Sequence, residues 1–436
     1  MANTSNEFKQ IYHDEKTLES DAYTVYTNIT TGGAMRGYGI PQAAFAAECM
    51  ADDLALALHM DPLEFRKKNC MRPGYVDPHT HVKCNTYGLA ECMEKGREFI
   101  RWDEKRREYE NQTGPVRKGI GMAIFCYKTG VYPISLETAS CRMILNQDGS
   151  MQLQMGATEI GQGADTVFTQ MAAEVTGITE DKVNVLSTQD TDVSPFDTGA
   201  YASRQTYVSG MAVKKTGAIF KEKILDYAAY MLEKPQDTLD VRDNHIVDKV
   251  TGTQLLPMEE LATTAFYSLD RSVHITAEAT SHCKTNTFAT GACFAEVEVD
   301  MPLGKVKVTN IVNVHDSGKL INPKLAAAQV HGGMSMGLGY GLSEELLFDA
   351  KGRPLNDNLL DYKLPTAMDT PDLNALFVEL DDPTGPFGNK ALGEPPAIPV
   401  APAVRNAVLN ATGVAVDSLP MDPQKMVKHF KEAGLI

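Results

Sequence analysis

The most informative stretch of the chain is Gly385-Pro-Phe-Gly-Asn-Lys-Ala-Leu-Gly-Glu394-Pro-Pro396. It holds one carboxylate between a glycine, which lets the backbone pass close to another group, and two prolines, which have a fixed φ and no N–H donor. Residues 401–410 then predict a helix that Gly413 is placed to end. A rigid loop that presents one carboxylate at the start of a helix is suited to hold a general base. The alternative is an ordinary loop glutamate, because glutamates are common in loops rich in glycine and proline.

Four other segments also place glycines and small polar residues at the expected start of a helix. Helix N-termini carry unpaired N–H donors and the positive end of the helix dipole, and glycines let a ligand reach that backbone. Several such turns that converge would bind a large polar, phosphorylated cofactor, although each alone is more often a tight turn. The segments are Gly33–Gln42, Gly156–Thr166, Asp197–Thr206 and Ala328–Gly333.

The composition indicates a globular protein with an acidic surface. The 436 residues are 43% hydrophobic and 22% charged, and 41 Lys+Arg against 57 Asp+Glu give a net charge of −16. This balance argues against nucleic acid or an anionic membrane as a partner. No apolar run approaches the roughly 20 residues of a membrane span, and no signal-peptide pattern is present. We therefore expect a cytoplasmic protein with two or three domains.

The eight cysteines are scattered without a C-x-x-C pair, so we expect buried thiols and no iron–sulfur cluster bound by this chain. The segment His79-Thr-His-Val-Lys-Cys84 has the residue types of a zinc site but lacks a fourth ligand nearby. Sequence patterns of a Walker loop, a Rossmann fingerprint, a serine nucleophile elbow and a His-Glu-x-x-His zinc motif are absent, which disfavours the corresponding chemistries.

Strands and helices are expected to mix without a regular βαβ rhythm, which predicts an α+β fold. Hairpins are predicted around Asp148-Gly149 and Pro302–Gly304, and a strand over 23–35. Asp61 is predicted to cap a short helix. The longer helices are predicted over about 41–60, 89–109, 204–233 and 326–346. The expected domains are an extended lead-in over 1–22, the end of a first domain over 23–117, and a second domain over 118–436.

Four motifs occur in order: Arg36-Gly-Tyr-Gly with Pro41-Gln42, Thr158–Thr166, His315-Asp-Ser-Gly-Lys-Leu-Ile-Asn-Pro323 and Lys390–Pro396. Together they resemble the molybdopterin-binding subunit of the xanthine dehydrogenase (xanthine oxidase) family, over about residue 23 to the C-terminus. The resemblance implies the mixed sheets and helices of the molybdenum-cofactor-binding domains of molybdenum hydroxylases. It also implies hydroxylation of an electron-poor carbon with a water-derived oxygen, in which Glu394 is the base.

The resemblance also implies roles for individual residues. Arg36, with Gly37, matches a loop beside the molybdenum, which is expected to be held through the pterin near Arg36 and Ala202. Tyr38 stands where relatives commonly carry a phenylalanine that stacks on substrate, although a core tyrosine is the alternative. His315 is expected to fix the loop around Asp316. The residues expected to hold the pterin and its phosphate are Gly161, Gln162, Ala202, Ser203, Gln205, Thr206 and Gln329, with helix capping as the alternative for Thr206 and Gln329.

The implied cofactor is molybdenum–molybdopterin, with the cytosine dinucleotide form and selenium in place of sulfur left open. Iron–sulfur clusters and FAD are expected on partner subunits. In most relatives a further N-terminal half precedes the Arg36 segment, so we expect a split enzyme. Its other parts would be a second molybdopterin-binding subunit, an iron–sulfur subunit and an FAD subunit, assembled as a dimer of heteromers.

The expected substrate is a purine, xanthine or hypoxanthine, which would place the enzyme in purine metabolism. Because Tyr38 departs from the family pattern, nicotinate, an aldehyde or an aromatic acyl-CoA remain open. Two alternatives belong to other classes: a non-catalytic scaffold half, and an assembly factor that carries the cofactor in transit. A base held ready at position 394 argues against the scaffold.

Overall fold

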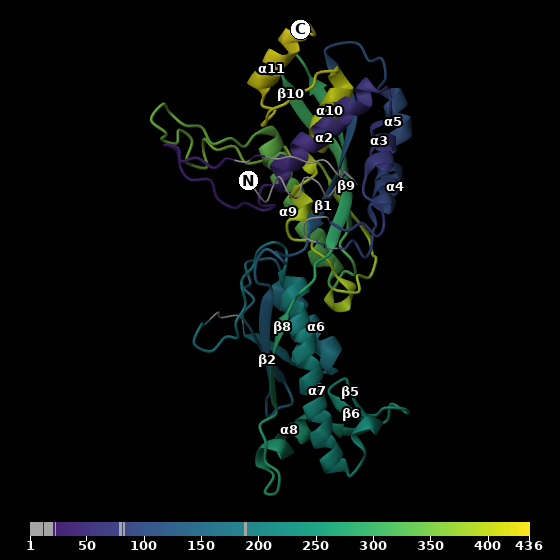
Figure 1. The fold of residues 1–436 in the computed structure, drawn as a ribbon, viewed down its shortest axis with the longest axis vertical. Helices are drawn as coiled ribbons and strands as arrows, with labels where there is room; N and C mark the ends of the chain where they lie inside the picture. The colour runs from purple at the N-terminus through teal and green to yellow at the C-terminus, as the bar shows by residue number, and fades with distance from the viewer. Residues whose placement is uncertain (1–11, 13–20, 22, 78–80, 82, 187–189) are drawn as a thin grey trace. The chain divides into compact units, whose positions relative to one another are not determined.

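The computed structural model describes residues 12, 21, 23–77, 81, 83–186 and 190–436. Mixed sheets and helices confirm the predicted α+β fold (Figure 1). The predicted domain limits at residues 22 and 117 stay a prediction. The chain divides into two compact units: the first comprises Met1–Lys128, Thr287–Asp381 and Ala391–Ile436, and the second Thr129–Asn286 and Asp382–Lys390.

The first unit is built on a four-stranded sheet. Its strands, in spatial order, are β1 (Val116–Lys128), β9 (Phe288–Asp300), β10 (Lys305–Asp316) and β11 (Leu373–Val378). The first three are antiparallel neighbours, and β11 runs parallel to β10. β9 and β10 are the predicted hairpin around Pro302–Gly304, extended to 13 and 12 residues.

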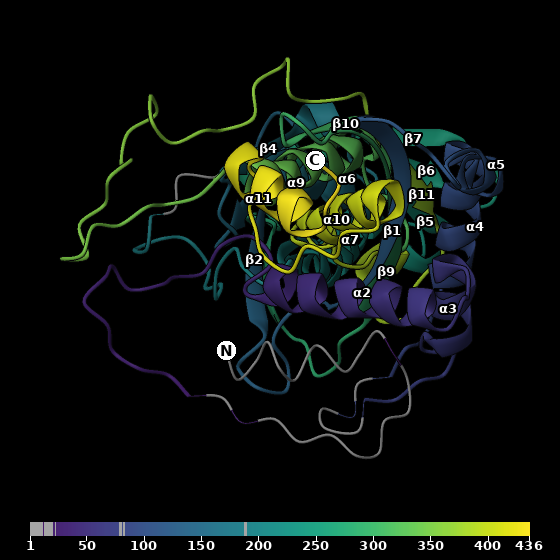
Figure 2. The same cartoon turned by 90° about the horizontal axis from the view of Figure 1, so that it is seen from above.

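Helices cover both faces of this sheet (Figures 1 and 2). One face packs against α3 (Pro62–Asn69), α4 (Leu89–Ile100) and α5 (Trp102–Glu108), in a core that includes Phe294. The other face packs against α9 (Pro323–Leu342) and α10 (Val400–Thr412). On this side α2 (Ile40–Ala57) lies beside α10, and α11 (Pro423–Glu432) contacts β10. Gly121 of β1 allows the close fit, because a Cβ there would lie 2.1 Å from the backbone nitrogen of Ala407 in α10.

Two local predictions in this unit are wrong, and one is confirmed. The single helix over 89–109 is broken at Arg101, which has a left-handed φ of 61° and separates α4 from α5. The segment 23–35 forms no strand, and Tyr23 and Tyr26 are largely exposed, so no packing reinforces the β propensity of these residues. Asp61 caps α3 as predicted, because its carboxylate accepts hydrogen bonds from the backbone N–H groups of Leu63 and Glu64.

Within its described residues, the second unit has two sheets and three α-helices. One sheet has the order β4 (Val183–Leu186), β3 (Met151–Met155), β2 (Thr138–Leu145), β8 (Thr276–His282), and includes the predicted hairpin at Gly149. The other sheet consists of β5 (Leu239–Arg242), β6 (His245–Asp248) and β7 (Gln254–Pro257). The helices are α6 (Ala164–Thr176), α7 (Gly210–Leu232) and α8 (Met258–Tyr267). The helix predicted over 204–233 begins instead with a π-helical turn, Gln205–Ser209, that precedes α7.

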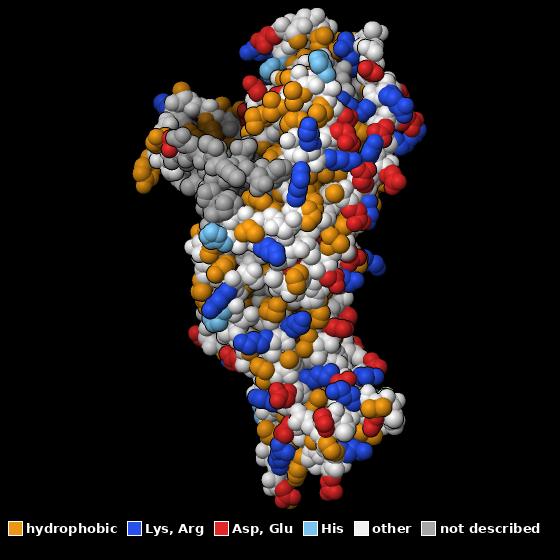
Figure 3. All heavy atoms as spheres, turned by 45° about the vertical axis from the view of Figure 1, so that its right-hand side comes forward, with side chains coloured by type: hydrophobic (Ala, Val, Ile, Leu, Met, Phe, Trp, Pro, Cys, Tyr) orange, Lys and Arg blue, Asp and Glu red, His pale blue; other side chains and the backbone are white. Residues whose placement is uncertain are grey.

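Charges of both signs are interspersed on the face drawn in Figure 3, as on ordinary globular surfaces. The eight cysteines all lie in the described part of the chain and form no disulfide, and seven of them are buried. Among the described residues, every helix is too short or too polar to cross a bilayer.

Candidate functional site

A left-handed turn before α2 presents the backbone of Gly37. Gly37, Tyr38 and Gly39 have φ values of 99°, 47° and 88°, and the Tyr38 N–H donates to the Met35 carbonyl over 2.7 Å. A Cβ at Gly37 would lie 2.6 Å from Cγ of Pro41, so this position requires glycine. The turn leaves the Tyr38 side chain 57% exposed. The core-tyrosine alternative is therefore wrong.

Arg36 connects three chain segments of the first unit. Its Nε donates to the Gly393 carbonyl over 2.5 Å, and its Nη2 donates to the carbonyl and the side-chain oxygen of Gln329 over 2.8 and 3.2 Å. Burial lowers the pKa of Arg36, and the carboxylate of Glu394 opposes that shift. The guanidinium thus fastens the Glu394 loop to α9.

The half-buried carboxylate of Glu394 is held at both oxygens. Oε1 accepts a hydrogen bond from the Gly37 N–H over 3.2 Å, and Oε2 accepts one from the Tyr127 hydroxyl over 2.6 Å. The loop continues into the short 3₁₀ helix η6 (Pro395–Ala397), where Pro396 lies so close to α9 that a Cβ on Gly333 would meet its Cβ at 2.4 Å. The structure therefore brings together four of the predicted site residues, namely Arg36, Gly37, Gln329 and Glu394.

His315 does not fix the loop that follows it, contrary to the prediction. Its ring is fully buried beside Phe125, at 4.8 Å between centroids, and neither ring nitrogen has a hydrogen-bond partner among the described residues. The carboxylate of Asp316 holds the loop instead, because it accepts hydrogen bonds from the N–H groups of Gly318 and Gly88 over 3.2 and 2.8 Å. Burial, aided by the charge of Arg36, lowers the pKa of His315 to about 3, so the ring is neutral at pH 7.

Replacing His315 with glutamine should change how stability depends on pH. Below about pH 6.5 the unfolded chain binds a proton at His315, whereas the folded chain does not until about pH 3. Wild-type stability is therefore lost as the pH falls through this window, by about 1.4 kcal/mol per pH unit from this ring alone. Denaturant unfolding of both proteins from pH 7 to pH 4 should show that the free energy of unfolding of the wild type falls relative to that of the variant. A difference that is constant with pH would contradict the burial argument.

In the second unit, a strained turn is fixed by Arg204. Ala202 and Ser203 have φ values of 48° and 52°, and the Ala202 carbonyl accepts a hydrogen bond from the Gly130 N–H over 2.8 Å. The fully buried guanidinium of Arg204 forms ion pairs with Glu137 over 2.6 Å and Asp197 over 2.5 Å. This buried cluster holds the backbone of the turn in a conformation that non-glycine residues rarely adopt.

The same unit brings together two of the predicted glutamines, Gln162 and Gln205. Nε2 of Gln162 donates to Oε1 of Gln205 over 2.6 Å, and both amides donate to the Thr158 carbonyl. Glu159 accepts hydrogen bonds from the N–H groups of Gly161, Gly163 and Asp165 at the start of α6. Burial would raise the pKa of Glu159, but these N–H groups lower it overall. Thr206 lies half-buried in the π-helical turn that Gln205 begins.

Sequence reasoning missed Tyr127 of β1 as a contact of Glu394, as well as Glu159 at the start of α6. An aromatic residue in an apolar strand predicts core packing, and 267 positions separate Tyr127 from the carboxylate that it contacts. The sequence did contain a signal for Glu159, because a glutamate just before a glycine-rich helix start can accept hydrogen bonds from the backbone N–H groups of the first helical turn.

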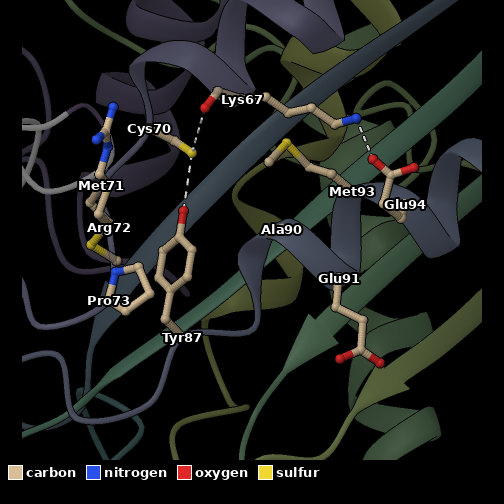
Figure 4. A pocket seen from close by; sticks show the side chains of 10 residues that line it. All are labelled: Lys67, Cys70, Met71, Arg72, Pro73, Tyr87, Ala90, Glu91, Met93 and Glu94. Atoms are coloured by element: carbon tan, nitrogen blue, oxygen red, sulfur yellow. Dashed lines mark hydrogen bonds and ion pairs between the residues drawn. The ribbon is translucent and has the colours of Figure 1, made fainter.

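A cavity of about 540 Å³ lies elsewhere in the first unit, and no predicted site residue lines it (Figure 4). Its lining includes Met71, Met93 and Tyr87, whose hydroxyl lies 3.0 Å from Sγ of Cys70. Figure 4 also shows the ion pair between Lys67 and Glu94. This cavity is therefore separate from the Arg36–Glu394 cluster.

The donor sets suit a polar organic cofactor better than a metal bound directly by protein. Within the part of the chain that the structure describes, no group of three or more His, Cys, Asp or Glu side chains is placed to hold a metal ion. In the segment His79–Cys84, which has the residue types of a zinc site, His79 lies outside the described residues. Buried polar atoms of Asn313 in the first unit, and of Thr198 and Asn389 in the second, have no partner among the described residues. Neutral amides and hydroxyls of this kind fit the polar edges of a pterin.

Comparison with known proteins gives the class and the family. Residues 95–371 match a family model described as a molybdopterin cofactor-binding domain, and residues 1–70 match a second model of that description. The chain therefore belongs to the molybdopterin-binding subunits of the xanthine dehydrogenase family.

Individual relatives agree with this assignment. The chain is 49% identical to a putative xanthine dehydrogenase molybdenum-binding subunit of Escherichia coli, over 95% of this chain and 55% of the relative. It is 32% identical to a probable hypoxanthine oxidase of the same organism, over 93% and 42%. The solved quinoline 2-oxidoreductase of Pseudomonas putida superimposes with a TM-score of 0.84 and 25% identity, over 92% of this chain and 53% of that one. The chain thus spans about half the length of the relatives it matches.

Proposed function

We propose that this chain is the molybdenum-cofactor part of a multi-subunit hydroxylase, in which Glu394 is the general base. The observation that carries the proposal is the arrangement of Glu394. Its carboxylate is bonded to the Gly37 N–H and the Tyr127 hydroxyl, on a loop that Arg36 fastens to α9. A scaffold would not need a carboxylate held so firmly at both oxygens.

When bound, the molybdenum cofactor supplies a water-derived oxygen for the substrate carbon and accepts two electrons. The carboxylate of Glu394 takes up the proton that this oxygen loses. Arg36 keeps the loop in place by its bonds to Gly393 and Gln329, so the carboxylate does not have to be ordered during the reaction. The exposed ring of Tyr38 offers a face on which a planar heterocycle can stack.

Within each unit, the residues proposed to hold the cofactor are connected by hydrogen bonds or ion pairs. In the first unit, Arg36, Gly37 and Gln329 form one connected group. In the second unit, Gln162 and Gln205 form a hydrogen-bonded pair beside Gly161, and Arg204 fixes the turn that bears Ala202 and Ser203. The proposed pterin and phosphate contacts are Gly161, Gln162, Ala202, Ser203, Gln205, Thr206 and Gln329.

The proposed substrate is a purine, xanthine or hypoxanthine. The names of the two Escherichia coli relatives, a putative xanthine dehydrogenase subunit and a probable hypoxanthine oxidase, support this choice. The proposed partners are a second molybdopterin-binding subunit, an iron–sulfur subunit and an FAD subunit, which agrees with relatives that are themselves named as subunits.

Purification of the native complex followed by a substrate screen tests the proposal. Elemental analysis should find molybdenum in the purified complex, and xanthine or hypoxanthine should be oxidised faster than nicotinate, an aldehyde or an aromatic acyl-CoA. Faster oxidation of one of the other compounds would be consistent with the proposed hydroxylation but would show that the proposed purine substrate is wrong. A complex without molybdenum, or with molybdenum but no turnover of any of these compounds, would overturn the proposed function.

A further inference from the structure

The hydroxyl of Tyr127 makes a short hydrogen bond to the proposed base. Tyr127 lies next to the last residue of β1, and its Oη donates to Oε2 of Glu394 over 2.6 Å. The tyrosine is 4% exposed, so water competes little for this bond. A phenol that donates to a carboxylate belongs to the charge-assisted class of hydrogen bonds, which are short and about twice as strong as neutral ones.

The ring of Tyr127 is fixed by the same elements that bear the site. It belongs to a small buried cluster with Phe125 of β1, Ile40 at the start of α2, and Ala391 and Ile398 on either side of Glu394. Ile40 follows the turn of Gly37, and Ala391 precedes the carboxylate by three positions. The donor and the acceptor of the bond are therefore packed against one another's neighbours, which leaves the hydroxyl little freedom to turn away.

The two oxygens of Glu394 are not equivalent. Oε2 accepts the short bond from Tyr127, whereas Oε1 accepts a longer bond, 3.2 Å, from the backbone N–H of Gly37. The bond from Tyr127 is therefore the shorter of these two anchors of the carboxylate, and it holds Oε2.

We propose that Tyr127 is a positioning residue for Glu394: it anchors Oε2 and so directs Oε1 toward the proton that is transferred. This inference rests on the proposed role of Glu394 as the base. The competing explanation is that Tyr127 is an ordinary buried tyrosine whose hydroxyl found the nearest acceptor. In that case its loss would weaken the fold and leave the reaction unchanged.

The variant Tyr127→Phe removes the hydroxyl and keeps the ring in its cluster. We expect kcat to fall by about tenfold to hundredfold, the equivalent of one hydrogen bond to a charged group. KM should stay within about twofold and the molybdenum content should stay unchanged, because the variant alters neither the exposed Tyr38 nor the proposed pterin contacts. A kcat within about twofold of wild type would overturn the proposal.

Tyr109→Phe is the matched control. The Tyr109 hydroxyl also donates to a carboxylate, that of Glu296, and Tyr109 is 6% exposed in the same unit. The control should lower the thermal unfolding midpoint about as much as Tyr127→Phe does and leave kcat unchanged. An equal loss of kcat in both variants would mean that buried phenol bonds act through the fold in general, which would also overturn the proposal.

A double-mutant cycle on the purified protein supplies a measurement that does not depend on turnover. The shifts in unfolding midpoint from Tyr127→Phe and Glu394→Ala should be less than additive, because each variant breaks the same bond. Those from Tyr109→Phe and Glu394→Ala should add. Additive shifts for the first pair would overturn the pairing. Full activity of a Glu394 variant would instead reject the proposed function, so the two failures can be told apart.

Discussion

Replacing Glu394 with glutamine should lower kcat by about 10²–10⁴-fold, which is the range for the loss of a general base. The amide has nearly the same shape, and its oxygen can still accept the Gly37 N–H or the Tyr127 hydroxyl. It cannot take up a proton at pH 7. Steady-state rates normalised to molybdenum content measure the effect, because normalisation separates loss of chemistry from loss of cofactor.

Glu379→Gln provides the comparison for this variant. Glu379 is 40% exposed, forms an ion pair with Lys319 at 3.6 Å and lies outside the Arg36–Glu394 cluster, so its kcat should match the wild type. If Glu394→Gln hydroxylated substrate at nearly the wild-type rate with molybdenum still bound, the assignment of Glu394 as the base would be wrong.

Replacing Arg204 with methionine should lower the free energy of unfolding by about 3–5 kcal/mol, the usual result of removing one partner from a buried ion pair. Methionine would leave two carboxylates, those of Glu137 and Asp197, buried without their cation. It would also release the left-handed turn at Ala202 and Ser203. Denaturant unfolding measures the first effect, and molybdenum content after purification reports the second.

Arg353→Met should change the unfolding free energy by less than about 1 kcal/mol, because exposed ion pairs contribute little. Arg353 binds Asp349 over 2.8 Å, but its side chain is 73% exposed. Similar losses in Arg204→Met and Arg353→Met would show that the buried cluster does not stabilise the second unit. If the destabilised Arg204→Met protein kept its full molybdenum content, the conformation of the turn at Ala202 and Ser203 would not be required for cofactor binding.

Much of the secondary structure follows from local signals. The hairpins at Gly149 and Gly304, the cap at Asp61 and the end of α10 at Gly413 are all determined by one or two residues with special backbone or side-chain properties. The breaks were harder to predict. Arg101 interrupts a continuous helical pattern because α4 and α5 both pack against one core, which is a tertiary requirement that the local sequence does not reveal.

The site was only partly predictable for a related reason. Arg36 and Glu394 stand out because they lie among glycines and prolines, and a shared family pattern ordered those segments. Tyr127 and Asn313 lie within apolar strands, where a polar atom has no visible role until the strand is placed beside a loop from another part of the chain. His315 was misassigned because its neighbour Asp316, which has the stronger acceptor, makes the contacts to the loop.

The bonds among Arg36, Gln329, Gly37 and Glu394 all lie within one compact unit of the chain. The position of the carboxylate is therefore preorganised by folding. The conformational entropy of the carboxylate is lost when this unit folds, so the binding of cofactor or substrate does not have to order it. Variants that loosen this unit without touching the four residues, such as a larger side chain at Gly333, should consequently weaken catalysis before they weaken affinity.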